Sequence, residues 1–347
     1  MKILHLLQSN KFSGAENVVC QIVSMFKDEP DFEMVYCSPD GDIRQSLKER
    51  NVEFVPLKSF CIKEIKRAIK EQKPDIIHAH DISAGVFSAV AADKNIKIIS
   101  HVHVNNSNMA KVNYKTLLYK IAAKRFSHIF WVSDSCFECY AFRKSLENKS
   151  SVLFNVVDKK PIVERAENAE LKDNFDIAFI GRMQYQKNPQ KLINVFKILK
   201  EKYNPEFSAA IVGVGPMSDE IRNLINSENL QENVKMLGFL SNPMGILKNA
   251  KLMILTSRFE GTPMCALEAM ALGTPIVSTP TDGMTDLIKN GENGFLCESD
   301  EELAKAVHDI ISDSDLRKSF SLKAEEKFNA LMNLNEYKNQ LLKAYKG

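Results

Sequence analysis

Short apolar runs of strand length alternate with segments of helical periodicity along most of the chain. In the first half, the predicted strands are 2–7, 32–37, 52–55, 76–80, 98–102, 129–132 and 152–154. The helices predicted between them are 15–26, 43–50, 62–71, 83–93, 114–123 and 134–142. Strands that alternate with helices form βαβ units and a parallel sheet. We therefore expect the first half to be a doubly wound α/β domain.

The same alternation continues in the second half, after a charged segment at 158–174 that is typical of a linker. The strands predicted there are 177–180, 209–212, 234–237, 252–255, 275–278 and 294–296. The predicted helices are 189–202, 216–227, 244–248, 264–272 and 301–312, followed by 316–328 and 335–345. The pattern predicts a second doubly wound domain.

These elements indicate an α/β protein with two Rossmann-like domains facing each other across a cleft. The expected domains are 1–165 and 172–328, and the C-terminal helix at about 330–347 is expected to pack back on the first. In such sheets, ligands bind beyond the carboxyl ends of the strands. The cleft between the domains is therefore the natural place for a site.

Composition narrows the class of protein. The chain has 347 residues, of which 44% are hydrophobic and 26% charged, as in globular proteins. The longest small and apolar run, 84–92, is too short to cross a bilayer. Seven cysteines without framework spacing indicate a reducing compartment, so we expect a cytoplasmic protein. The sequence argues against a membrane-spanning protein, a disulfide scaffold, a coiled coil and a nucleic-acid-binding module.

Charge is unevenly distributed along the chain. The overall net charge is +2, but residues 1–165 carry +6 and residues 166–347 carry −4. This distribution has two interpretations of equal weight. It arises by chance, or the first half of the chain meets an anionic partner. The segment 109–126 holds four lysines, one arginine and no acidic residue. It predicts either a core helix with a solvated face or a peripheral contact with an anionic membrane, at the inner face of the cell membrane.

An apolar face accompanies these lysines. In helical spacing, Leu117, Leu118 and Ile121 share one face with Tyr114. A face of this kind between basic residues is typical of elements that lie on membrane surfaces, and it is equally typical of a helix that covers a core.

The segment 257–279 (SRFEGTPMCALEAMALGTPIVST) follows a predicted strand and opens a helix. Gly261 permits a tight turn, Thr262 is a good N-cap and Pro263 is a good first helical residue. The backbone N–H groups of the first helical turn, as far as Met264, would have no partner within the helix. This geometry predicts an anion site.

Two carboxylates flank the predicted anion site. Glu260 precedes the turn and Glu268 lies within the helix. Phosphate accepts hydrogen bonds from N–H groups, whereas hydroxyl groups donate to carboxylates. The pair suits a ligand that has both phosphate and hydroxyl groups. An ordinary capped helix with a solvated glutamate at each end is the alternative.

Two cations follow another predicted strand end, in the segment 179–189 (FIGRMQYQKNP). Gly181 turns the chain there, and Arg182 and Lys187 come next. An arginine fork and a lysine point charge at a carboxyl strand end could meet a diphosphate. The alternative is a pair of solvated surface cations.

Histidines recur at two neighbouring strand ends. His78 and His80, and likewise His101 and His103, occupy alternate positions that place both rings of a pair on one face. Beside Asp81, four such rings could bind zinc. They could also be buried core or cleft histidines without a ligand.

A third turn follows the first strand. Ser13 and Glu16 have the spacing of a capping box at a helix start, with Gly14 between them.

The segment around the two glutamates resembles a known enzyme family. The spacing of Glu260 and Glu268, with EGTP, LEAMALGTPIV and the following TDG, is similar to the E-x7-E signature of the retaining glycosyltransferases of GT-B type, family 4. In that family, the first glutamate contacts hydroxyls of the donor sugar and the second binds the ribose. The backbone after the first glutamate, here Gly261, Thr262, Pro263 and Met264, holds the donor diphosphate.

The resemblance assigns further roles. Arg182 and Lys187 resemble the family's loop cations that stabilise the departing diphosphate, although Asn188 stands where glycine is common. Gly14 resembles a glycine whose backbone reaches the donor phosphates, with serine at position 13 in place of the usual first glycine. The family's strand-end histidine faces the transferred sugar. His103 is the expected counterpart, and His101 is the alternative.

The resemblance therefore implies a retaining glycosyltransferase that moves a sugar from a nucleoside diphosphate donor, with UDP expected by default, to a hydroxyl of a glycan or lipid-linked glycan in surface polysaccharide biosynthesis. No metal or other cofactor is expected. The D-x-D strings at 40–42 and 313–315, which hold a metal in another glycosyltransferase class, fall at turns or helix starts. Two alternatives stay open: a nucleotide-sugar epimerase on the same scaffold, and a non-catalytic nucleotide- or dinucleotide-binding module that rests on IVGVGP at 211–216.

Overall fold

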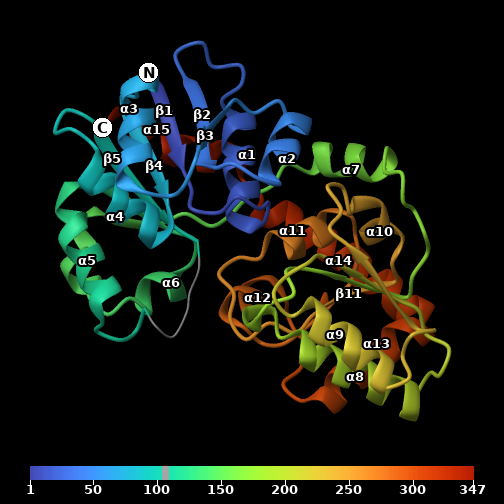
Figure 1. Cartoon of the computed structure of the whole chain (residues 1–347). Coiled ribbons are helices and arrows are strands. Elements are labelled where there is room, and N and C mark those ends of the chain that lie inside the picture. The colour runs from blue at the N-terminus through green and yellow to red at the C-terminus, as the bar shows by residue number, and fades with distance from the viewer. Residues whose placement is uncertain (104–108) are drawn as a thin grey trace. The chain divides into compact units, whose positions relative to one another are not determined.

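The chain divides into two compact units. The computed structural model describes residues 1–103 and 109–347. Unit 1 comprises Met1–Val156 together with Asn333–Gly347, and unit 2 comprises Val157–Met332 (Figure 1). The division falls before residue 165, where the sequence places the end of the first domain.

Unit 1 is built on a seven-stranded parallel sheet of order β3-β2-β1-β4-β5-β6-β7. Its strands are β1 (Lys2–Leu6), β2 (Glu33–Pro39), β3 (Phe54–Leu57), β4 (Ile76–His80), β5 (Lys97–Val102), β6 (Phe126–Trp131) and β7 (Ser150–Val152). Its helices are α1 (Gly14–Met25), α2 (Ile43–Glu49), α3 (Ile62–Gln72), α4 (Asp81–Ala91), α5 (Tyr114–Ala122), α6 (Asp134–Glu138) and α15 (Leu334–Lys346), with short 3-10 turns η1 (Ala123–Arg125), η2 (Arg143–Ser145) and η3 (Glu147–Lys149).

Unit 2 repeats the architecture with a six-stranded parallel sheet of order β10-β9-β8-β11-β12-β13. Its strands are β8 (Ile177–Ile180), β9 (Ala209–Val212), β10 (Val234–Gly238), β11 (Leu252–Leu255), β12 (Ile276–Ser278) and β13 (Gly294–Leu296). Its helices are α7 (Lys159–Glu167), α8 (Pro189–Lys202), α9 (Ser218–Ser227), α10 (Met244–Asn249), α11 (Met264–Ala271), α12 (Asp282–Leu287), α13 (Asp300–Ser312) and α14 (Ser314–Leu331), with the 3-10 turn η4 (Tyr185–Lys187).

Part of the segment 158–174, which the sequence predicts to be a linker, forms a helix. Lys159–Glu167 forms α7, which the side chain of Asp158 caps by accepting a hydrogen bond from the Lys160 N–H at 2.9 Å. Ile162 and Ala166 are buried on one face of this helix, because they are four residues apart. The surrounding charges hide this short apolar stripe in the sequence pattern.

Other differences are shifts of boundary. The strand predicted at 52–55 lies at Phe54–Leu57, and the one predicted at 152–154 lies at Ser150–Val152. The helix predicted at 134–142 ends at Glu138 and gives way to 3-10 turns. Helix α12 has no predicted counterpart, because its six residues are too few to show a helical period.

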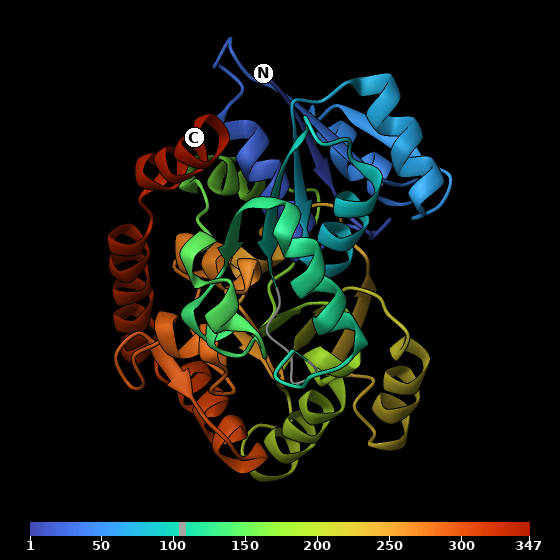
Figure 2. The same cartoon turned by 90° about the vertical axis from the view of Figure 1, so that its left-hand side faces the viewer.

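The C-terminal helix α15 returns to unit 1 (Figures 1 and 2). Tyr345 is buried and its ring centroid lies 5.8 Å from that of Phe26 in an edge-on arrangement. Lys338 Nζ contacts Glu29 Oε1 at 2.5 Å at the edge of the same contact. Unit 1 is therefore completed by residues that follow unit 2 in the sequence.

Both sheets reverse their strand order at one point. In unit 1 the reversal lies between β1 and β4, and in unit 2 it lies between β8 and β11. In sheets of this kind, ligands commonly bind at the order reversal, beyond the carboxyl ends of the strands. Among residues 1–103 and 109–347, no helix has the length and apolar character needed to span a bilayer.

Candidate functional site

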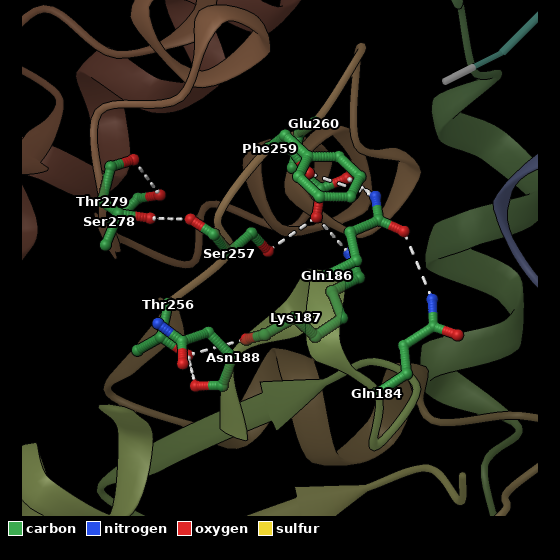
Figure 3. Close-up of polar contacts among 10 residues, drawn as sticks. All are labelled: Gln184, Gln186, Lys187, Asn188, Thr256, Ser257, Phe259, Glu260, Ser278 and Thr279. Atoms are coloured by element: carbon green, nitrogen blue, oxygen red, sulfur yellow. Dashed lines mark hydrogen bonds and ion pairs between the residues drawn. The ribbon is translucent and has the colours of Figure 1, made fainter. Parts of the chain in front are cut away.

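An ion pair joins the two loops that flank the order reversal of unit 2. Lys187 follows β8, Glu260 follows β11, and Lys187 Nζ lies 2.5 Å from Glu260 Oε1 (Figure 3). The Lys187 side chain is 14% exposed and that of Glu260 is 7% exposed. The structure thus brings together two residues that the sequence singled out separately.

Lys187 keeps its positive charge in this buried position. Burial is the strongest influence on the pKa of Lys187 and acts to lower it. The charge of Glu260 and the hydrogen bond that it accepts from Lys187 outweigh burial, so that the pKa of Lys187 is raised above its ordinary value. A raised lysine pKa keeps the ammonium charged at neutral pH.

Two neutral side chains hold the carboxylate of Glu260 in place. Ser257 Oγ donates to Glu260 Oε1 at 2.6 Å. Gln186 Nε2 donates to Glu260 Oε2 at 3.3 Å and to the Phe259 carbonyl at 3.1 Å (Figure 3). Both oxygens of the carboxylate therefore have donors in addition to Lys187, which fixes its orientation.

The loop after β8 is tied to the loop after β11 through its backbone. Thr256 Oγ1 donates to the carbonyls of Lys187 and Asn188 at 3.0 and 3.1 Å (Figure 3). Arg258 Nη2 donates to Asn188 Oδ1 at 2.8 Å, and its guanidinium lies 4.4 Å from the centroid of the Tyr185 ring. These contacts position Lys187 from both sides.

Asn188 explains how the loop tolerates a residue other than glycine. It has the left-handed backbone conformation, with φ 50° and ψ 55°, directly before Pro189 at the start of α8. Asparagine adopts this conformation more readily than other non-glycine residues. The backbone shape that glycine would favour is therefore kept.

Glycines allow the loops of unit 2 to approach one another closely. Gly213 has φ +128°, and a Cβ atom there would lie 2.1 Å from the carbonyl oxygen of Gly181. A Cβ atom on Gly283 would lie 1.2 Å from the carbonyl oxygen of Gly261. The first close approach lies directly before the half-buried Arg182 in the chain, and the second lies in the turn that follows Glu260.

The turn after Glu260 differs in one detail from its prediction. Helix α11 begins at Met264, and Pro263 occupies the N-cap position with φ −71° and ψ 119°. The prediction of Thr262 as the N-cap was therefore wrong, since proline ends the extended segment one residue later. Gly261, Thr262, Pro263 and Met264 are all buried. In the first turn of α11 the Ala266 N–H donates to the Pro263 carbonyl at 3.0 Å, so that the amides of Met264 and Cys265 are the ones without a helical carbonyl to bond.

Glu268 lies within α11 and is 7% exposed. Cys265, one turn before it, lies close enough to Lys187, Glu260 and Glu268 to be affected by their charges. Burial raises the pKa of the Cys265 thiol to about 11, and Lys187 opposes this effect. Cys265 is therefore a neutral thiol among charged groups.

Gly14 and His103 belong to unit 1, whereas the other predicted site residues belong to unit 2. Gly14 is the first residue of α1, and a Cβ atom there would meet nothing within 4 Å. The predicted capping box is wrong: Ser13 Oγ donates to Glu16 Oε2 at 2.5 Å instead of accepting from a backbone amide.

His103 follows β5 and is buried. Its Nε2 lies 2.8 Å from Nδ1 of His80, and its backbone N–H donates to Asp81 Oδ1 at 2.8 Å. Its Nδ1 has no partner among the described residues. His101 has no partner at either ring nitrogen within the same part of the chain and is fully buried, while His103 is 7% exposed.

Ser257, Gln186, Arg258, Thr256 and Cys265 were missed as members of this site. Each is a sequence neighbour of a predicted residue, and four of them are polar residues directly after a strand or in its following loop. That position at the carboxyl end of a parallel strand was the available signal.

Two sequence families match consecutive parts of the chain. The family described as "Glycosyltransferase Family 4" matches residues 12–160, and the one described as "Glycosyl transferases group 1" matches residues 160–327. The chain belongs to glycosyltransferase family 4. It is a glycosyltransferase with the GT-B fold of two Rossmann-like domains.

Individual relatives of this family 4 glycosyltransferase include named enzymes. An Escherichia coli UDP-Gal:alpha-D-GlcNAc-diphosphoundecaprenol alpha-1,3-galactosyltransferase is 27% identical over 86% of this chain and 84% of its own length. An uncharacterised glycosyltransferase of Methanocaldococcus jannaschii is 29% identical over 74% of this chain and 76% of its own. Among solved structures, Anabaena HepE in complex with UDP and glucose has a TM-score of 0.83 at 20% identity, covering 100% of this chain and 99% of that one.

Proposed function

We propose that this glycosyltransferase transfers a sugar from a UDP-sugar to a hydroxyl of a glycan or lipid-linked glycan acceptor, with retention of anomeric configuration, in surface polysaccharide assembly. The observation that carries the proposal is the Lys187–Glu260 pair beside the start of α11, at the order reversal of unit 2. The activity named for the Escherichia coli relative, which acts on a diphosphoundecaprenol-linked sugar, supports the acceptor class.

The chemical difficulty of such a transfer is the charge that builds up on the leaving diphosphate. Arg182, Lys187 and the backbone amides at the start of α11 supply positive charge and hydrogen-bond donors for it. Each such donor contributes on the order of 10²–10³ in rate, by analogy with oxyanion-hole donors. When the diphosphate is bound, Lys187 has two anions to neutralise, the carboxylate of Glu260 and the phosphate.

The carboxylates and one histidine act on hydroxyl groups in this proposal. Glu260, held by Ser257 and Gln186, orients the donor sugar, and Glu268 binds the ribose. Gly14 lets the backbone of unit 1 approach the donor phosphates. His103 is the proposed contact to the transferred sugar, through Nδ1, which has no partner among the described residues. No step uses a metal ion or another cofactor.

The test is a donor screen that measures nucleotide diphosphate release with and without candidate acceptors, in EDTA. Arg182→Ala is expected to lower turnover about 100-fold, because it removes one donor to the leaving group. Arg222→Ala, an exposed cation on α9, is the matched control and should keep wild-type turnover. Wild-type turnover in R182A, or activity that needs added Mn²⁺, would contradict the mechanism. Conversion of the donor without acceptor would indicate an epimerase.

We further propose that α5 and its flanks contact an anionic membrane at the inner face of the cell membrane. Tyr114, Leu117, Leu118 and Ile121 are 70%, 46%, 48% and 55% exposed, while Thr116, Tyr119 and Ala122 on the other side of the helix are buried. The exposed apolar side chains alternate with the lysines at positions 111, 115, 120 and 124. A lipid-linked acceptor would be presented at such a surface.

A further inference from the structure

Five histidines form a continuous buried array in unit 1. They stand on β1, β4 and β5 or directly after β5, and all are at most 7% exposed: His5, His78, His80, His101 and His103. In the sheet register His5 is opposite His78, and His80 is opposite His101, so that all five rings share one face. The intervening residues on the other face, such as Leu4 and Ile77, belong to an apolar core.

The array contains more polar ring atoms than it can satisfy. Two ring-to-ring contacts exist, His5 Nδ1 to His80 Nε2 at 3.1 Å and His80 Nδ1 to His103 Nε2 at 2.8 Å. Five ring nitrogens have no partner among the described residues: His5 Nε2, His78 Nε2, His101 Nδ1 and Nε2, and His103 Nδ1. Buried polar atoms are rarely left in this state, because each has lost its hydrogen bonds to water without gaining another.

We infer that His5, His78 and His80 bind one divalent transition-metal ion of the Zn²⁺, Co²⁺ or Ni²⁺ type. One ring nitrogen from each residue lies within 4.8 Å of the others. Two imidazole nitrogens on a tetrahedral ion at 2.0–2.1 Å are about 3.4 Å apart. The 3.1 Å between His5 Nδ1 and His80 Nε2 is already close to this separation.

Neighbouring groups set the ring tautomers that such a site needs. His78 Nδ1 lies 2.9 Å from Tyr345 Oη, and donation of its N–H to that oxygen leaves Nε2 with a lone pair for the ion. His80 Nδ1, donating to His103 Nε2, likewise leaves its own Nε2 for the ion. His5 binds through Nδ1 and carries its proton on Nε2. Partners of this kind orient metal-binding histidines in many proteins.

The protonation states also suit metal binding. A histidine ligand must be neutral. Burial lowers the pKa of His5 to about 3, and it lowers the pKa values of His78 and His80 well below the ordinary value, with the neighbouring histidines adding to the effect. All-imidazole ligand sets favour zinc, copper, nickel and cobalt over magnesium or calcium. The ion would be structural, since none of the three histidines has a role in the proposed sugar transfer.

Metal binding by the untagged full chain tests the inference. Equilibrium dialysis with Co²⁺, followed by metal analysis and the visible absorption of the ion, is expected to give one tightly bound equivalent per chain. His5→Gln and His78→Gln should each lose this equivalent. Tyr345→Phe keeps all three ligands but removes a hydrogen bond to one of them, so that affinity should fall about 10–100-fold. Circular dichroism checks that each variant is folded.

Two control variants separate this site from others. His128 lies on β6 outside the trio and bonds to Ser151, so His128→Gln should bind Co²⁺ like the wild type. His101→Gln should also retain the ion. Loss of the ion in H101Q with retention in H5Q would overturn the assignment in favour of His80, His101 and His103, the other trio of this array. No binding by the wild type, or loss in H128Q, would overturn the site altogether. Neither result depends on sugar transfer.

Discussion

In the proposed mechanism Lys187 has two partners, Glu260 and the donor diphosphate, and the structure contains the first of them. The pair is mostly buried, and Ser257 and Gln186 hold its carboxylate. Removing one member of a buried ion pair leaves an uncompensated charge, whereas removing both leaves none. The contribution of Lys187 to stability can therefore be measured separately from its proposed role in sugar transfer.

A double-mutant cycle measures the structural part. Lys187→Met is expected to lower the free energy of unfolding by about 3 kcal/mol, because Glu260 stays buried without its cation. Lys187→Met combined with Glu260→Gln should recover most of this loss. The measurement is urea unfolding followed by circular dichroism.

A second pair in unit 2 serves as the control for that cycle. Lys191 Nζ lies 2.5 Å from Asp300 Oδ1, but the two side chains are 18% and 26% exposed. Its coupling energy should be the smaller of the two. Equal coupling energies, or a double variant as unstable as K187M, would contradict the account of the first pair.

Local spacing pointed to Lys187 and Glu260 separately but could not predict that they pair. Glu260 and Glu268 follow from a turn before a helix, and Arg182 and Lys187 follow from a strand end. Lys187 and Glu260 are 73 residues apart, and only the adjacency of β8 and β11 brings them together. Thr262 is not the N-cap of α11 because Pro263 occupies that position. Ser13 does occupy the N-cap position of α1, but the predicted capping box is absent because its hydroxyl donates to the Glu16 carboxylate.

At the scale of elements, long periodic segments were predictable and short or highly charged ones were not. The strands with continuous apolar runs, such as β9 and β11, were found because burial on both faces demands such runs. Helix α7 was missed because its buried residues are few among many charges. Helix α5 was found, but only the structure shows that its apolar residues divide between a buried and an exposed side.

The exposed side of α5 yields a prediction for membrane binding. Changing Lys115, Lys120 and Lys124 to glutamate should remove most binding to vesicles that contain anionic lipid, because each basic residue near such a surface contributes about 1 kcal/mol. Co-sedimentation with the vesicles at two salt concentrations is the measurement.

Helix α3 offers a matched control for charge. The lysines at positions 63, 66 and 70 are exposed on a helix of the same unit, and their replacement by glutamate makes the same change in net charge. That variant should keep most of the binding. Equal loss in both variants, or binding that does not respond to salt, would contradict a specific contact through α5.

At the scale of the whole molecule, the titratable histidines are concentrated in one unit. Six of the seven histidines lie in unit 1, and only His308 lies in unit 2. Burial lowers the pKa of His5 and His103 to about 3, from 6.5, and also lowers those of His78, His80 and His101. As the pH falls below 6.5, the unfolded chain binds protons that the folded unit does not. Stability is therefore present above pH 6.5 and is lost towards pH 3.

Acid should consequently unfold unit 1 before unit 2. Between pH 7 and pH 5, each of the five buried histidines is expected to reduce the free energy of unfolding by about 1–2 kcal/mol. Trp131, the single tryptophan, is fully buried in unit 1, so its fluorescence reports on that unit alone. Fluorescence and far-ultraviolet circular dichroism are followed during acid titration in EDTA. The fluorescence transition should come at the higher pH, and coincident transitions would contradict the prediction.

The return of α15 to unit 1 affects the order in which the molecule can fold during synthesis. Unit 2 is one uninterrupted stretch, and all of its residues leave the ribosome before Tyr345 does. Synthesis of unit 1 begins earlier, but the contacts of Tyr345 with His78 and Phe26 cannot form until α15 has been synthesised. The half of the protein that is translated first is therefore the half that is finished last.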